Sequence, residues 1–227
     1  MSEKEKVHST DAESAVIDIT KGFWANNSKK IVYALSAILV LVGGIWGYDY
    51  FIAKPKEQKA QEEIFRAEAN FRKDSLSLAL NGNSTTTGFL KIISKYKGTA
   101  TGNLAQLYAG ECYLQLGDFK NAVKHLEAFD ANGAKQIEAK AEGLLGDAYS
   151  ELKENDKAIS HYKKAGQLFP EDAFLSSEYL FRAGLLLELS GKTNEAISVY
   201  KELKEKFPRT EKGFSIDKYL ARLGETN

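Results

Sequence analysis

Three segments within residues 103–208 share one spacing of small and bulky residues, and this repeat limits the possible folds more than any other feature. Each segment places an alanine twelve residues after a glycine, with a bulky residue three positions beyond the glycine. In the last two segments a proline follows twelve residues after the alanine. The repeat residues are Gly110, Tyr113, Ala122, Gly146, Tyr149, Ala158, Pro170, Gly184, Leu187, Ala196 and Pro208. Successive glycines lie 36 and 38 residues apart, a period typical of stacked helix pairs.

Each repeat is expected to contain two helices joined by a short turn. The predicted pairs are 101–116 with 119–129, 137–152 with 156–167, and 173–189 with 193–207. The repeat glycines then lie in mid-helix, where glycine costs about 1 kcal/mol relative to alanine. We expect close approach of the second helix to offset this cost, with the repeat alanines meeting the glycines. Leu126, Tyr162 and Tyr200 would fill the remaining space, and the prolines would end the second helices.

Residues 103–208 resemble three tetratricopeptide repeats, because the period and the glycine–alanine–proline spacing match that pattern. The resemblance implies an all-α solenoid, a right-handed stack of antiparallel helix pairs with a concave face lined by the first helices. Such repeats hold partner proteins and rarely carry catalytic residues. We assign 101–210 to three repeats, 53–100 to an extended helix with a degenerate first repeat, and 211–227 to one C-terminal capping helix. The degenerate repeat is expected to pair helices over 54–74 and 89–96.

An uncharged run from Ile31 to Tyr48 is flanked by lysines on both sides. About 20 helical residues cross the ~30 Å hydrocarbon core of a bilayer. A buried core helix would show a polar stripe and a cleaved signal peptide would end in small residues, whereas this run ends in aromatic ones. We predict one transmembrane helix over 29–52, after a short polar tail, 1–28, that is disordered apart from one short helix near 15–24. Gly43 and Gly47 have the spacing that lets another membrane helix approach closely.

Lysines lie close to both ends of this span, so charge alone does not decide its orientation. The layout of tail, span and repeats is similar to the YfgM-like family of bacterial inner-membrane proteins. The segment Phe23–Lys30, followed by the span and Gly47-Tyr48, carries this resemblance. It implies a cytoplasmic N-terminus, a periplasmic repeat domain and a role as an accessory subunit of the SecYEG translocon. The partner implied beside the translocon is a membrane-anchored periplasmic chaperone of the PpiD type.

In the repeat geometry, one residue set on the first helices is expected to form the partner groove. The predicted groove residues are Leu104, Leu107, Glu111, Leu114, Lys140, Asp147, Glu151, Glu178, Phe181, Leu185 and Glu188. Apolar patches separated by acidic residues would suit a partly hydrophobic helix or extended segment with some basic residues. The alternative is that some of these apolar residues pack against the extended first helix or the C-terminal helix.

Composition and motifs argue against several other classes of protein. Lys plus Arg and Asp plus Glu number 31 each, so the basic field typical of nucleic-acid binding is lacking. No phosphate-binding loop or hydrolase motif occurs, and we predict no enzyme, cofactor, metal or small-molecule substrate. Cys112 is expected to be buried, and His125 and His161, at equivalent repeat positions, are expected to pack rather than bind metal. Two rival functions stay open: a scaffold for another cell-envelope complex, and a chaperone that binds unfolded chains directly.

Overall fold

The computed structural model describes residues 3–225 of the chain, and it divides into two compact units, Met1–Pro55 and Lys56–Asn227. Every regular element among the described residues is a helix, and one isolated β-bridge joins Gly82 to Thr87. The predicted all-α fold with one long apolar N-terminal helix is therefore confirmed.

The first unit consists of α1 (Glu3–Tyr48) and a π-helix, η1 (Asp49–Ala53). Its apolar part satisfies the length and composition of a membrane span, and none of it is buried within the protein. The expected disordered tail over 1–28 is wrong for the backbone from Glu3 onward, because α1 is helical there. No proline and only one glycine precede residue 43, so little in the sequence interrupts a helix.

The π-helix ends two residues before Pro55, the second residue of α2 (Lys54–Arg72). Proline has no amide hydrogen and its ring crowds the carbonyl four residues earlier. The amide of Lys54 bonds to the carbonyl of Asp49, five residues back, so the helix widens by one residue where the proline enters. Helix thus continues from the span into α2, with a locally altered turn between them.

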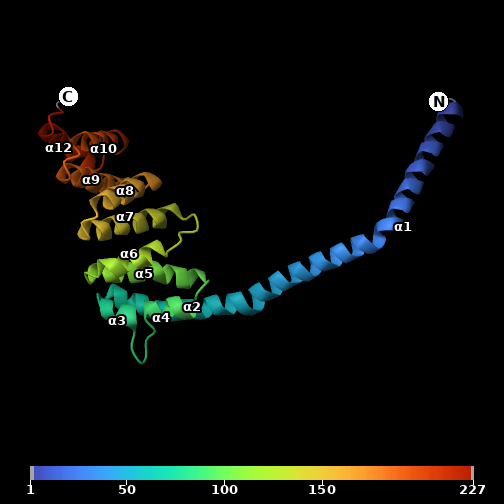
Figure 1. The fold of residues 1–227 in the computed structure, drawn as a ribbon, viewed down its shortest axis with the longest axis horizontal. Coiled ribbons are helices and arrows are strands. Elements are labelled where there is room, and N and C mark those ends of the chain that lie inside the picture. Colours follow the sequence, from blue (N-terminus) through green and yellow to red (C-terminus); the bar gives the residue numbers. More distant parts are fainter. Residues whose placement is uncertain (1–2, 226–227) are drawn as a thin grey trace. The chain divides into compact units, whose positions relative to one another are not determined.

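The second unit stacks short helices in sequence order, each antiparallel to the one before along α5 to α10 (Figure 1). Its remaining helices are α3 (Leu76–Asn81), α4 (Phe89–Lys95), α5 (Ala100–Gln115), α6 (Phe119–Glu127), α7 (Lys135–Glu151), α8 (Asn155–Leu168), α9 (Ala173–Leu189), α10 (Thr193–Lys206), α11 (Glu211–Ser215) and α12 (Asp217–Arg222). The pairs α5/α6, α7/α8 and α9/α10 are the three predicted repeats, and their boundaries differ from the prediction by at most two residues.

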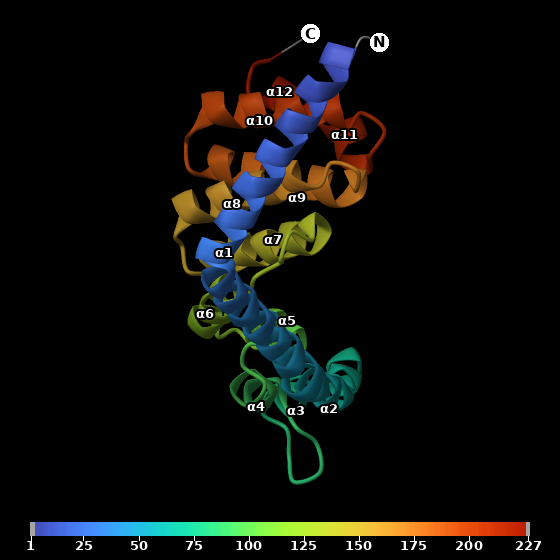
Figure 2. The same ribbon diagram turned by 90° about the vertical axis from the view of Figure 1, so that its right-hand side faces the viewer.

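Two predictions about the ends of the stack are wrong in detail. The degenerate first repeat contains a third helix, α3, before the loop that projects at the end of the stack in Figure 2. The single capping helix expected within 211–227 is broken at Ile216 into α11 and α12. Ile216 is fully buried, and its place at the break lets two short helices cover the last repeat.

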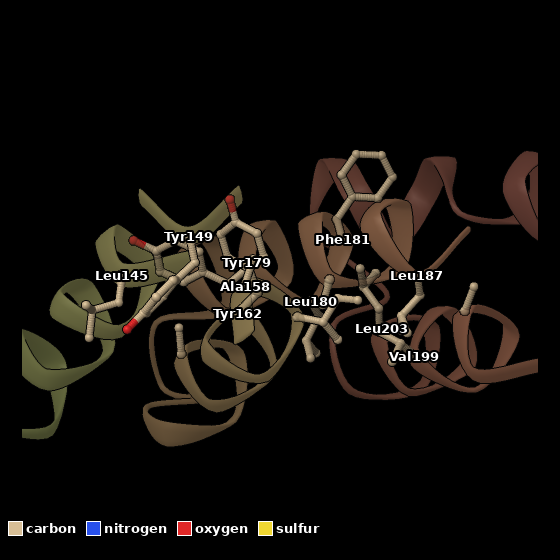
Figure 3. Close-up of a cluster of buried hydrophobic side chains, with 14 of the residues drawn as sticks. Leu145, Tyr149, Ala158, Tyr162, Tyr179, Leu180, Phe181, Leu187, Val199 and Leu203 are labelled. Atoms are coloured by element: carbon tan, nitrogen blue, oxygen red, sulfur yellow. The ribbon is translucent and has the colours of Figure 1, made fainter. Parts of the chain in front are cut away.

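The apolar core consists of two clusters that meet at α5. One cluster joins α2, α3 and α4 to one face of α5 through Ala105, Ala109 and Cys112. The other runs from Leu107 through the later repeats to α12. Figure 3 shows part of this second cluster, in which the tyrosines Tyr149, Tyr162 and Tyr179 lie among leucines.

A side chain would not fit at the repeat glycines, as the sequence predicts. The residue that occupies the space is not mainly the repeat alanine, however, but a bulky residue one turn further along the second helix. A Cβ at Gly110 would collide with Leu126, and one at Gly146 with Tyr162. A Cβ at Gly184 would collide with Tyr200. The bulky side chain of the second helix therefore lies over each glycine, while the repeat alanines are fully buried one turn earlier.

Candidate partner-binding surface

The first helices α5, α7 and α9 carry all the predicted groove residues, but the residues three positions before the repeat glycines do not face a groove. Leu107 and Phe181 are buried, and the ring of Tyr179 from α9 covers Gly143. The ring of Tyr219 from α12 meets Phe181 edge-on with centroids 4.9 Å apart. This position packs each first helix against the next, so Leu107 and Phe181 are core residues and unavailable to a partner.

All the acidic groove residues except Glu151 are joined to basic residues of the following helices in a series we call the ion-pair ladder. Its pairs are Glu111–Lys140 at 2.8 Å, Asp147–Arg182 at 2.6 Å, Glu178–Lys212 at 3.3 Å and Glu188–Arg222 at 2.8 Å. The first two pairs connect one first helix to the next, and the last two attach α11 and α12 to α9. Apart from Glu151, the acids that the sequence suggests would attract a basic partner are thus neutralised by the ladder.

Arg182 is the most connected member of the ladder. Its Nη1 donates to Asp147 and its Nε donates to Glu178 at 3.0 Å. Burial alone would raise the pKa of Glu178, but hydrogen bonds from Arg182 and the charge of Lys212 outweigh it, so that pKa is lowered. The hydroxyl of Tyr162 also donates to Asp147 at 2.7 Å, which ties the second helix of the repeat to the ladder.

The apolar residues that stay open on the first helices lie at their ends. Leu189, the last residue of α9, is 82% exposed, and Phe174, near its start, is 71% exposed. Ile137 occupies the first turn of α7 and is 40% exposed. Leu104, Leu114 and Leu185 are half-buried against the core, and Glu151 is exposed. We define Ile137, Phe174 and Leu189 as the open apolar residues.

Sequence reasoning missed Ile137 and Phe174 as candidate site residues because it placed the groove mainly at mid-helix positions. The available signal was their position: apolar residues in a first or last helical turn have fewer neighbours to cover them than mid-helix ones. Only a comparison of all first helices, including their terminal turns, would have raised them as candidates.

The two repeat histidines join the helices of a pair. His125 stacks on Tyr113 and His161 on Tyr149, with ring centroids 5.4 Å and 5.3 Å apart. The Nδ1 atom of His125 lies 2.6 Å from Gln106 Oε1, and that of His161 lies 2.7 Å from Glu142 Oε2. Burial lowers the pKa of His125. Within the described residues, no group of three His, Cys, Asp or Glu side chains is placed to hold a metal ion.

Glu142 is the most deeply buried carboxylate among these partners, at 9% exposure. Burial raises its pKa, but hydrogen bonds from His161 and from Lys164, at 2.8 Å, outweigh that effect and lower the pKa overall. The thiol of Cys112 is also buried, and burial raises its pKa to about 12, which keeps it protonated. Both groups therefore have structural surroundings rather than those of a reactive centre.

In the candidate span, Gly43 and Gly47 have open space beside them. Nothing lies within 4 Å of the position that a Cβ would take at either residue. Packing of another membrane helix against these two glycines stays a prediction.

Comparison with known proteins identifies one family. The family described as "Tetratricopeptide repeat-like domain" matches residues 21–214, from within α1 to within α11. No curated protein matches the sequence. Among solved structures, the crystal structure of MamA protein is 20% identical, with a TM-score of 0.49 over 72% of this chain and 76% of that chain.

Proposed function

Because this chain belongs to the tetratricopeptide repeat-like family, whose fold serves as a scaffold for protein–protein contacts, we propose that it is a membrane-anchored interaction protein. The observation that carries the anchor is the apolar stretch of α1, of which no part is buried in the protein. An apolar helix of that length is stable where lipid rather than water surrounds it. The repeat unit would then bind protein partners beside the membrane, without enzymatic activity of its own.

The specific role we propose is that of an accessory subunit of the SecYEG translocon in a bacterial inner membrane. The N-terminus would lie in the cytoplasm and the repeat unit in the periplasm, where it would couple secreted polypeptides to a PpiD-like chaperone. The order of tail, span and repeats in one chain supports this role, and the family match extends into α1. Gly43 and Gly47 would contact the translocon within the bilayer.

Partner contact would centre on the open apolar residues. The ion-pair ladder leaves little unpaired charge among its own members, so an apolar partner segment is favoured over a strongly basic one. Phe174 and Leu189 together offer two large apolar side chains on one helix, α9. Truncation costs more than ~1 kcal/mol of binding free energy only at the minority of interface residues that dominate binding, and we propose that Phe174 and Leu189 are among them.

Co-purification of the full-length protein with its membrane partners tests this role. Wild-type protein should retain translocon and chaperone subunits in mild detergent, and Phe174→Ser with Leu189→Ser should lose the chaperone about tenfold or more, equal to ~1.4 kcal/mol. Lys120→Ser is the control, because Lys120 is exposed on the second helix α6. Retention of unrelated envelope-assembly proteins instead would favour the rival scaffold and remove the translocon role.

The exposed Phe174 and Leu189 also support the rival function of a direct chaperone, since unfolded chains bind exposed apolar side chains. Full-length protein in nanodiscs should then suppress aggregation of an unfolded client, and the Phe174→Ser, Leu189→Ser variant should not. If the wild-type protein does not suppress aggregation, the direct-chaperone function is ruled out.

A further inference from the structure

The segment between the membrane span and the repeat unit combines an altered helical turn with a proline. η1 replaces the α-helical turn over Asp49–Ala53, and Pro55 follows two residues after its end. The boundary between the two compact units falls at the same place, after Pro55. Sharp changes of helix direction arise mainly at prolines and π-turns. Both causes meet here within seven residues.

Specific contacts hold the residues on both sides of this segment in place, whereas few contacts hold the segment itself. Upstream, Trp46 and Tyr48 are aromatic residues of the kind that anchor a span at the membrane surface. Trp46 also stacks on Tyr50, within η1, with ring centroids 5.6 Å apart. Downstream, the Lys56 ammonium donates to the carbonyl of Lys97 at 2.7 Å, and Glu57 accepts from the amide of Thr101 at 3.1 Å. From Lys56 onward, α2 is therefore attached to the repeats.

Between these flanks, little holds the turn in one geometry. None of the residues of η1 is buried. One ion pair spans it, Asp49–Lys54 at 3.1 Å, and both of its side chains are more than half exposed. Exposed pairs of this kind contribute only ~0–1 kcal/mol. Proline also removes one backbone hydrogen bond from the helix, which lowers its resistance to bending.

We propose that residues 49–55 form a hinge that lets the repeat unit change direction relative to the membrane anchor. The hinge rests on the proposed function, because it needs α1 to be held in a bilayer. Its consequence is that the open apolar residues can reach partners at more than one angle while the span stays in place. Hinges of this type need only a few residues that absorb the change of backbone angles.

The hinge is tested by spin-label distances in full-length protein inserted in nanodiscs. Labels at Leu39→Cys and Lys73→Cys lie on either side of the segment, at exposed positions, and native Cys112 is buried and unreactive. In one straight α-helix they would be about 51 Å apart, at about 1.5 Å per residue. We expect a distance distribution about twofold broader than that of a control pair within the repeat unit, Lys73→Cys with Lys124→Cys.

Two variants distinguish bending at the hinge from other causes of a broad distance distribution. Pro55→Ala restores the missing amide, and Pro55→Ala with deletion of Tyr50 also removes the extra residue of the π-turn. Both should narrow the distribution toward the control and the straight-helix distance. A narrow wild-type distribution, or one that both variants leave broad, would overturn the hinge alone. Failure of wild-type protein to insert into nanodiscs would overturn the anchor, and the hinge with it.

Discussion

At the scale of single residues, the repeat is defined by what lies over each glycine. Leu126, Tyr162 and Tyr200 occupy the space that a Cβ would need at the three repeat glycines. This pairing explains why the second helix of each repeat can lie so close to the first. The alanines, one turn earlier on the second helix, are fully buried, and the Ala122 carbonyl oxygen lies 3.3 Å from the position that a Cβ would take at Gly110.

Gly146→Ala should destabilise the protein although alanine favours helix. The helix propensity gain is about 1 kcal/mol, whereas forcing a methyl group into a packed core costs about 1–3 kcal/mol. We expect a net loss of about 1 kcal/mol, measured by thermal unfolding of full-length protein in detergent. Because the methyl group meets the Tyr162 ring, Gly146→Ala should cost less in a Tyr162→Ala background. Equal or greater stability of the single variant would contradict this packing.

Glu142→Gln recreates in the second repeat the neutral pair that Gln106 makes with His125 in the first. The folded-state pKa of Glu142 is lowered, so its ionised form stabilises the fold above the unfolded pKa, about 4.3. That contribution is lost as pH falls through the lowered folded pKa. We expect Glu142→Gln to cost about 1–2 kcal/mol at neutral pH and progressively less below pH ~4.

The matched control for this pH dependence is Glu138→Gln. Glu138 pairs with the same Lys164 at 3.4 Å but its side chain is 33% exposed, against 12% for Glu142. Its substitution should have a smaller effect on unfolding at every pH. If Glu142→Gln were as mild as Glu138→Gln, the buried network around His161 would contribute no more than a surface pair.

At the scale of helices and turns, each repeat changes direction through one residue with positive φ. The three residues are Gly117 at 78°, Lys153 at 63° and Gly191 at 74°. Glycine adopts this conformation without the side-chain clash that other residues incur. The second repeat is the exception, because a lysine occupies the position there.

Lys153→Gly should therefore stabilise the protein. Glycine adopts the left-handed conformation without strain, which should raise the free energy of unfolding by about 1–2 kcal/mol. The greater conformational freedom of glycine in the unfolded chain should lower it by about 0.4–1 kcal/mol. We expect the free energy of unfolding to rise by about 0.5–1 kcal/mol, which a higher midpoint temperature of thermal unfolding would show. Gly191→Lys at the equivalent turn is the control and should change stability in the opposite direction. If both substitutions changed the unfolding midpoint in the same direction, the claim that the two turns share one geometry would be wrong.

The sequence predicts the repeat helices well because strong local signals mark their ends. Gly117 and Gly191 mark turns, and Pro170 and Pro208 each follow a helix end by two residues. It misses α3 because six residues are too few to show a helical period, and it misses the break at Ile216 because burial in the stack decides it. Phe181 is misplaced for the same reason: Tyr219, from another element, covers it.

At the scale of the whole molecule, the chain carries an apolar helix that nothing in it buries and a repeat unit whose ladder acids are neutralised internally. The first feature meets the length and composition of a membrane span, which supports the proposed anchor. The second supports the proposal that partners contact apolar side chains. The sequence shows that the groove positions carry acidic residues, but it does not show their basic partners. Those partners, Arg182, Lys212 and Arg222, lie on helices distant in sequence from the acids that they pair with.

The central claim is that this is a membrane-anchored scaffold that contacts proteins through the ends of its first helices. In-cell photo-crosslinking from a probe at Leu189, read by mass spectrometry, tests it most directly. The account predicts adducts with membrane or secretory-pathway proteins from Leu189, and few or none from a probe at the exposed Lys120 on α6. Equal adducts from both positions, or adducts from neither, would contradict it.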